Sequence, residues 1–493
     1  MSGQNISDIE NRVYLGISKD TVYPTNAKGY SPKVEYPEYV FGSNNLSLEN
    51  PVYDLVREGF YTLGYDKVNY GVKEWNPLGE FINEGDTVLI KPNWVMHYNK
   101  NKDHQDNMEC LVTHPSTVRA VIDYTLIALK NTGRVIIADA PMQGCNLQEM
   151  FSKTGYLELF EFYKSEGIHL EIIDLRQCRV NTNKHIITET IAINGEDQSI
   201  QVELGQESAH LSDSNLRYKV SDYKADNTNQ YHHDRIHTYN INKNVLLADV
   251  ILNMPKPKCH RLAGLTAAQK NIVGITYDKA CLPHRSIGAK ISGGDEYQKR
   301  SIIKALITRI EEKKLGLTQN GKTFSAIILQ FLIAILYVSV KVCSKDKVMI
   351  GSWYGNDTIW RTVSDLNFIV RYADKNGAIR DTPQRRILNI ADMIIAGQGN
   401  GPVGPSPKNL GMILIGEDSS LIDAICAKIM GFNIEKVPGL NSTMRNNRLR
   451  VEGIKNIYSN NQKYNNVLFE DFLPDENWRF IPHDSWKDFI ENY

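Results

Sequence analysis

Short apolar runs that each end in a polar residue restrict the fold of this chain more than any other feature. The segments TVLI, VIIA, VILNM and MIIA are followed by Lys91, by Asp139, by Lys256 and by the loop 397–405. Such runs alternate with segments of helical spacing such as 115–130, which is typical of buried parallel strands joined by crossover helices. The sequence therefore predicts an α/β fold with a mostly parallel sheet.

Residues 183–242 interrupt this pattern, because HIITETIAI and SIQVEL alternate between apolar and polar side chains. A period of two indicates half-exposed antiparallel strands rather than another crossover unit. We therefore expect an antiparallel insertion within the α/β fold. The expected parts are an N-terminal wrapping arm (1–84), a first α/β half (85–182), the insertion (183–242), a return to the sheet with a polar loop (243–300), a helical segment with an apolar stretch (301–352), a second α/β half (353–436) and a C-terminal tail (437–493).

The charge balance and the cysteines argue against several classes of protein. The 493 residues carry 56 Lys and Arg against 57 Asp and Glu, so no overall basic field is available to attract nucleic acid. The first residues lack a basic segment followed by an apolar run, so we expect a cytoplasmic protein. The seven cysteines include no CxxC pair, which argues against an iron–sulfur cluster and against a disulfide framework.

One uncharged stretch, residues 323–340, is 18 residues long and lies between Lys322 and Lys341. This length is at the lower limit for a membrane span, and Gln330 lies in its middle. If motifs on both sides of the stretch build one site, a full span would place them on opposite sides of a bilayer. We therefore expect a buried or interfacial helix, and a peripheral contact with the inner membrane stays open.

The polar residues after the apolar runs predict one shared small-molecule site, because ligands of open α/β sheets bind beyond the carboxyl ends of the strands. The richest stretch is PKPKCHRLAGLTAAQKNIVG, in which Lys256, Lys258 and His260 alternate and Lys270 and Asn271 follow on a helix. Converging ammonium groups suit a phosphate or a carboxylate. An imidazole with a near-neutral pKa suits a general acid or base.

Two further segments supply candidates. The long polar loop 278–296 is expected to act as a lid or binding loop. In GSWYGNDTIWRTVSDLN, Asp357 fits a helix N-cap and Arg361 with Asp365 fits an i, i+4 pair, although the tryptophans also fit a platform for a sugar or base. The predicted catalytic residues are His260, Lys270 and His284. The predicted substrate-binding residues are Lys91, Asn93, Asp139, Lys256, Lys258, Asn271, Arg285, Asp295, Trp353, Asn356, Asp357, Arg361, Gly399, Asn400 and Gly401.

Cofactor motifs are few. A formal GxGxxG at 399–404 does not predict a dinucleotide, because its prolines prevent the helix that such a motif must open. The same loop can still offer backbone N–H groups to an anion. In YHHDRIH the candidate metal ligands are His232, His233 and His237, since the 233/237 spacing would place two imidazoles on one face of a helix. A divalent metal therefore stays open as a cofactor.

Taken together, KPNW, ADAP, ADVILNMPKPKCHRLAGLTAAQKNIVG, DKACLPHRSIG with GGDEY, and WYGNDTIWRT resemble the domain-of-unknown-function 362 family over residues 85–435. Some members join this domain to ferredoxin-like segments, whose cysteine spacing this chain lacks. Members of this length are similar to proteins encoded near bacterial surface-polysaccharide genes, which implies a glycan-related substrate. A more distant likeness to the lactate racemase fold would imply proton transfer at a carbon acid.

The favoured hypothesis is an enzyme of undetermined reaction that acts on a small anion, such as a sugar nucleotide or glycan precursor. It would bind the anion through lysines and use His/Lys acid–base chemistry. A non-catalytic binding or scaffold protein at the membrane surface in polysaccharide assembly is one alternative. A metal-dependent hydrolase or lyase is the other. The sequence does not separate lyase, isomerase and transferase activity, and it gives no oligomeric state.

Overall fold

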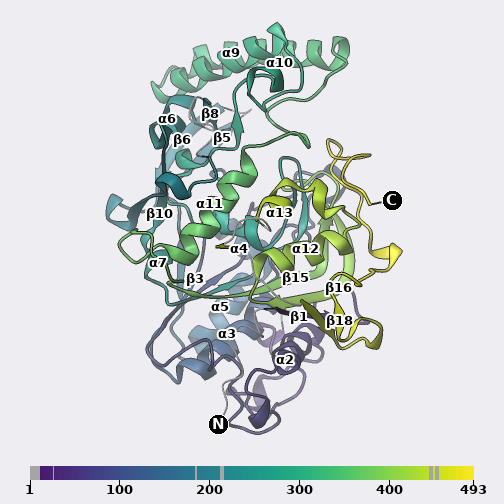
Figure 1. The fold of residues 1–493 in the computed structure, drawn as a ribbon. Coiled ribbons are helices and arrows are strands. Elements are labelled where there is room, and N and C mark those ends of the chain that lie inside the picture. Colours follow the sequence, from purple (N-terminus) through teal and green to yellow (C-terminus); the bar gives the residue numbers. More distant parts are fainter. Residues whose placement is uncertain are drawn as a thin grey trace.

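One large sheet forms the centre of the molecule, in the strand order β18-β17-β1-β16-β15-β11-β2-β3-β4 (Figure 1). In the computed structural model the described residues are 11–25, 27–183, 186–210, 216–221, 223–443, 448–449 and 455–492. The strands of the sheet are β1 (Arg12–Ile17), β2 (Thr87–Lys91), β3 (Arg134–Asp139), β4 (Glu171–Asp174), β11 (Val250–Asn253), β15 (Arg386–Gln398), β16 (Ser406–Gly416), β17 (Asn456–Ser459) and β18 (Val467–Leu468). A side hairpin of β12 (Lys258–His260) and β13 (Gly264–Thr266) joins β15.

The five neighbouring strands β15, β11, β2, β3 and β4 are all parallel. β16 runs antiparallel to β15 and to β1, which lies between β16 and β17. The predicted α/β fold with a mostly parallel sheet is thus confirmed. Because the central strands are parallel, their carboxyl ends meet at one edge of the sheet.

Helices cover both faces of the sheet (Figure 1). The helices of one face are α2 (Pro51–Leu63), α3 (Pro115–Leu129), α4 (Leu147–Thr154) and α5 (Tyr156–Ser165); those of the other are α7 (Lys243–Leu247), α8 (Ala268–Asn271), α11 (Ile359–Tyr372), α12 (Ser419–Ile429) and α13 (Pro438–Thr443). Successive residues of β2 face opposite sides: Val88 packs in the cluster with α3, and Leu89 packs in the cluster with α11. This burial on both faces explains why the central strands are continuous apolar runs.

Antiparallel pairs occur where the alternating pattern predicts them, but the first pair begins before the predicted insertion, because β5 (Cys178–Asn183) precedes residue 183 except at its last residue. β5 pairs with β6 (Ile186–Ala192), and β7 (Ser199–Glu203) pairs with β10 (Ile236–Asn242). β9 (His232–His233) extends the second pair, after α6 (Ala225–Tyr231). β8 (Tyr218–Lys219) pairs with β14 (Arg285–Ser286), so the insertion is joined to the polar loop that follows α8.

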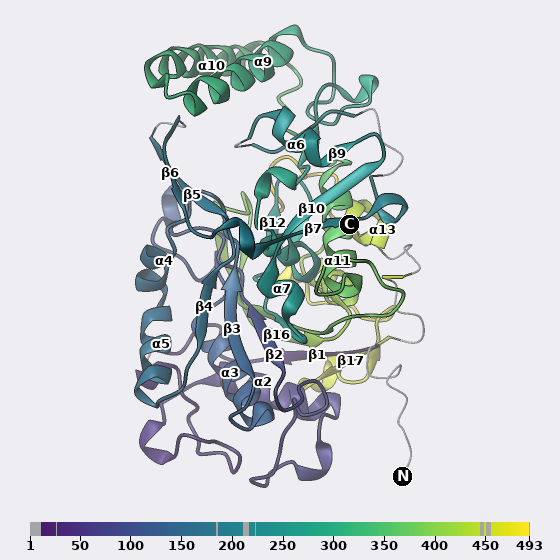
Figure 2. The same ribbon diagram turned by 90° about the vertical axis from the view of Figure 1, so that its left-hand side faces the viewer.

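A hairpin of two helices, α9 (Ile302–Gln319) and α10 (Thr323–Cys343), forms a layer across one end of the molecule (Figures 1 and 2). Among the described residues, α10 is the one helix whose length and composition would allow a membrane span, with a mean hydropathy of 2.3 over 18 residues. Length and composition alone are weak evidence for such a span. Only 17% of that window is buried, so α10 is not a core helix.

Lys256, which the sequence predicts as a substrate-binding residue, is used inside the fold. Its Nζ lies 2.8 Å from Asp392 Oδ2, and both side chains are fully buried. Lys256 also donates to the Ile395 carbonyl (3.1 Å), and Asp392 accepts from the Tyr23 hydroxyl and from the His114 backbone N–H. The ion pair ties the segment after β11 to β15, so Lys256 has a structural role.

We predict that Lys256→Met lowers the free energy of unfolding by about 3–5 kcal/mol, because it leaves the Asp392 carboxylate buried without a cation. Lys130→Met is the matched control, since Lys130 forms a surface ion pair with Glu84 and its loss should cost less than about 1 kcal/mol. Urea unfolding at pH 7 measures both values. Equal stability of the two variants would show that Lys256 is not a structural residue.

Candidate functional site

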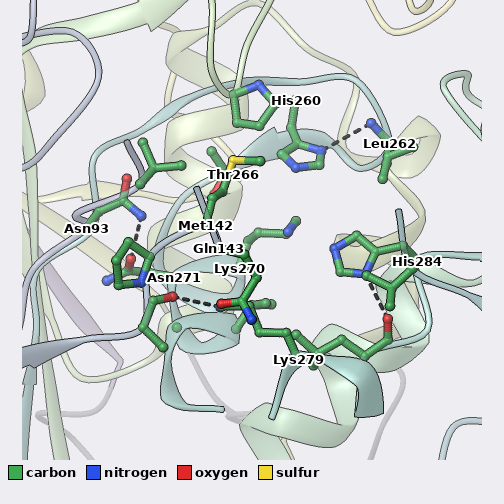
Figure 3. Close-up of a pocket in the computed structure, with 18 of the residues that line it drawn as sticks. Asn93, Met142, Gln143, His260, Leu262, Thr266, Lys270, Asn271, Lys279 and His284 are labelled. Atoms are coloured by element: carbon green, nitrogen blue, oxygen red, sulfur yellow. Dashed lines mark hydrogen bonds between the residues drawn. The ribbon is translucent and has the colours of Figure 1, made fainter. Parts of the chain in front are cut away.

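A cavity of about 180 Å³ lies beyond the carboxyl ends of the central parallel strands (Figure 3). Its walls come from the segments after β2 and β3, from β12, from α8, and from Val220, Ser221 and Tyr223 of the insertion. The first part of the predicted lid also contributes, through Lys279, Leu282 and His284. The cavity thus brings together segments that are far apart in the sequence, as the predicted shared site requires.

Asp139 lines this cavity and pairs with the fully buried Lys91. Lys91 Nζ lies 2.7 Å from Asp139 Oδ1, and Asp139 Oδ2 accepts from the Trp94 backbone N–H at 2.7 Å. Burial lowers the pKa of Lys91, and the Asp139 carboxylate opposes this effect. A Cβ atom on Gly274 would lie 2.0 Å from Asp139 Oδ1, so glycine is required there. The two charges neutralise each other and contribute no net charge to the cavity.

A chain of side-chain amides connects the cavity wall to the sheet. Lys258 Nζ donates to Asn93 Oδ1 (2.6 Å), and Asn93 Nδ2 donates to Asn271 Oδ1 (2.9 Å). Asn271 Nδ2 then donates to Asn253 Oδ1, and Asn253 Nδ2 to Asn389 Oδ1, both at 2.8 Å. Because an ammonium group can only donate, it fixes the orientation of every amide in the chain. Asn253 and Asn389 were not predicted, although both occur in apolar runs.

Three lysines line the cavity without a carboxylate partner. Burial lowers the pKa of Lys258 to about 7 and those of Lys270 and Lys279 to about 8. Lys279 Nζ donates to the Ala140 carbonyl at 2.8 Å, whereas Lys270 Nζ has no hydrogen bond or ion pair within the described part of the chain. Asp139 is the single carboxylate among the described lining residues, and it forms an ion pair with Lys91. The cavity therefore carries uncompensated positive charge.

His260 and His284 both line the cavity, and each leaves its Nε2 free, but the two rings are opposite tautomers (Figure 3). His260 Nδ1 accepts from the backbone N–H groups of Leu262 and Ala263, each at 3.1 Å, so its proton is on Nε2. His284 Nδ1 lies 2.8 Å from the Leu282 carbonyl and must donate to it, which leaves a lone pair on Nε2. Burial and the nearby Lys270 lower the pKa of His284 to about 3 and that of His260 well below its usual value. Near neutral pH the site therefore offers one N–H donor and one acceptor.

Other predicted substrate-binding residues surround the first turn of α11 instead. Arg285 pairs with Glu296 at 3.1 Å, and Trp353 Nε1 donates to the Asp295 carbonyl at 2.8 Å. Asn356 donates to the backbone carbonyl of His284 at 3.0 Å. None of the predicted residues in this group lines the cavity, within the residues that the structure describes. Asn356 acts by positioning the segment that carries His284.

The predicted N-cap role of Asp357 and the predicted pairing of Arg361 with Asp365 are wrong. The N-cap residue of α11 is Thr358, and the Asn356 side chain accepts from the first free N–H groups. Arg361 pairs with Asp357 at 2.9 Å rather than with Asp365. Asp365 is buried against the insertion, where it accepts from the Ser208 hydroxyl at 2.6 Å and from the Tyr239 hydroxyl at 2.9 Å.

In the glycine loop, Gly399 and Gly401 use their N–H groups for contacts within the protein. Gly399 donates to the Ile481 carbonyl and Gly401 donates to the Gly399 carbonyl, at 2.7 and 2.8 Å. Asn400 Oδ1 accepts from the backbone of Asp484 at 3.5 Å. The loop contributes Pro402 to the cavity wall. Gly399 and Asn400 therefore bind the C-terminal tail, and Gly401 is hydrogen-bonded within the loop.

The predicted histidine metal site is not assembled. The segment is a hairpin rather than a helix, so His232 and His237 are cross-strand neighbours with their Nδ1 atoms 3.1 Å apart. His233 is on the other side of the hairpin, half exposed, and pairs with Asp234. Over the described ranges, no group of three or more His, Cys, Asp or Glu side chains is arranged to hold a metal ion.

Comparisons with known proteins give a family and no individual relative. No curated protein and no solved structure matches the chain. The family model described as Domain of unknown function (DUF362) matches residues 88–196 and 208–428, which is more than half of the chain. The matched ranges include every residue that lines the cavity. The chain therefore belongs to the DUF362 family.

Proposed function

We propose that this protein is an enzyme that binds a small phosphate- or carboxylate-bearing molecule and moves a proton on it. The observation that carries the proposal is the Lys270 ammonium, which has no partner among the described residues and lines the same cavity as two histidines of opposite tautomer. Sugar nucleotides and other glycan precursors are among the anions that fit this charge.

The charge of the cavity supports an anionic ligand. Lysine pKa values fall when burial removes water from the ammonium and no anion replaces it. Lys258, Lys270 and Lys279 all show this effect around one space. A bound phosphate or carboxylate would restore their pKa values, and charge-assisted hydrogen bonds to it would be short and strong.

The two histidines support proton transfer. His284 Nε2 can accept a proton from a C–H or O–H group of the ligand. The His260 Nε2–H and the Lys270 ammonium can then stabilise the negative charge that develops on a ligand oxygen. An anion in the cavity would also raise the pKa of His284, because it offsets the cations that lower it. The proton can return from the His284 imidazolium or from Lys270, whose pKa is about 8.

We predict that Lys270→Met raises the free energy of unfolding at pH 7 by about 1–3 kcal/mol and weakens anion binding at least tenfold. Lys270 has a pKa of about 8 in the fold against 10.5 in an unfolded chain. The unfolded chain therefore binds more protons between these values, and wild-type stability rises with pH across that window. The variant should lose this rise, with Lys130→Met as control. A less stable variant would contradict a functional role.

Sulfate affinity should fall as the pH rises from 6 to 9, because Lys258 deprotonates near pH 7 and Lys270 and Lys279 near pH 8. Sulfate is the suitable probe, since its own charge is constant over this range. Titration calorimetry in two buffers with different ionisation enthalpies should show proton uptake on binding at pH 8. A pH-independent affinity would mean that sulfate binds elsewhere.

We predict that His284→Gln reduces proton exchange about 10²–10⁴-fold while sulfate binding changes little, because glutamine cannot serve as a base near neutral pH. The assay is NMR detection of deuterium incorporation from D₂O into a panel of carboxylates and phosphorylated sugars. His260→Gln is the control variant. It should keep proton exchange, since a glutamine amide can still donate the hydrogen bond that His260 Nε2–H provides. Sulfate binding without exchange in any compound would favour the non-catalytic alternative.

A further inference from the structure

The outer face of α10 is an unbroken row of exposed apolar side chains. These residues recur every three or four positions and are between 50% and 78% exposed; they are Phe324, Ile328, Phe331, Ile335, Val338 and Val342, here called the apolar stripe. The opposite face of α10 packs on α9 through Ile333 and Val340. The helix therefore packs one apolar face on α9 and presents the apolar stripe to the outside.

The hairpin carries an excess of positive charge. Residues 299–347 contain ten Lys or Arg and three Asp or Glu, whereas the net charge of the whole chain is −1. The three acids face inward: Glu311 accepts from the Tyr337 hydroxyl, Glu312 pairs with Lys219, and Asp346 pairs with Lys304. The exposed lysines nearest α10 in the sequence are 313, 322, 341, 345 and 347. An apolar face flanked by lysines suits a surface that is both anionic and apolar.

We propose that the apolar stripe docks on an anionic lipid bilayer, with α10 parallel to the surface and its flanking lysines at the headgroups. An in-plane helix keeps its packing on α9 and the 2.7 Å hydrogen bond from Lys314 to Gln330. A membrane span would break both. Pairing with a second copy is disfavoured, because Lys322 and Lys341 at the two ends of α10 would face the lysines of the other copy.

The test uses the full chain and vesicles of phosphatidylcholine, with or without phosphatidylglycerol. Cys343 follows Val342 in the last turn of α10 and is the exposed member of the seven cysteines, so it can carry an environment-sensitive fluorophore. We expect the protein to sediment with the anionic vesicles, the fluorescence to shift to the blue, and added salt to weaken both effects.

Two pairs of substitutions separate the two forces. Phe331→Ser with Ile335→Ser should lower the partition coefficient at least tenfold, through loss of apolar burial. Lys322→Glu with Lys341→Glu should lower it at least tenfold for anionic vesicles, since each lysine near such a surface contributes about 1 kcal/mol. Leu48→Ser with Leu473→Ser is the matched control, because these residues are 89% and 78% exposed elsewhere on the molecule and should leave binding unchanged.

Four results would overturn the proposal. The first is absence of sedimentation with anionic vesicles. The second is sedimentation that both variant pairs leave intact. The third is sedimentation without a fluorescence response at Cys343, which would assign the contact to another surface. The fourth is a stable dimer in light scattering that Phe331→Ser dissociates, which would make a second copy the partner of the stripe. Circular dichroism confirms that each variant is folded.

Discussion

The need to pair polar groups buried at the carboxyl ends of the parallel strands determines the rest of this structure. Lys91, Asn253 and Asn389 end up side by side on β2, β11 and β15, where water does not reach them. Asp139 satisfies Lys91, and the amide chain satisfies the two asparagines, with Asn389 donating to the Gly416 carbonyl on β16. Once these groups are paired, the lysines left over at the cavity are those available to a ligand.

The sequence predicts the sheet well because its signal is local. Runs such as TVLI and VIIA are buried on both faces wherever they lie in the order of strands, so their pattern survives without knowledge of the topology. The pairing of side chains is not local. Lys256 and Lys258 alternate along the sequence as predicted. Lys256 forms a buried ion pair only because Asp392 lies beside it on β15. The hairpin at His232 likewise depends on pairing between strands.

The helical hairpin and the cavity are connected by one buried lysine. Lys219 pairs with Glu312 of α9, and its strand β8 pairs with β14. The backbone N–H of His284 donates to the Lys219 carbonyl at 3.2 Å, and the neighbouring Val220 and Ser221 line the cavity. Binding of the α9–α10 hairpin to a surface would therefore also restrain the cavity wall that carries His284, the candidate base. The Lys219–Glu312 ion pair and the pairing of β8 with β14 therefore fix the position of the hairpin relative to the cavity.

Lys256 and Lys270 show why residue type alone cannot identify a functional group. Both are lysines of one short motif, and burial lowers the pKa of both. Lys256 has a carboxylate at 2.8 Å, so its burial is compensated and its removal leaves a charge behind. Lys270 has no such partner among the described residues, so its burial costs stability that the fold does not recover. A fold tolerates such a cost where an external anion completes the site, and that asymmetry, rather than the motif, is the reason to propose Lys270 as the residue that binds the ligand.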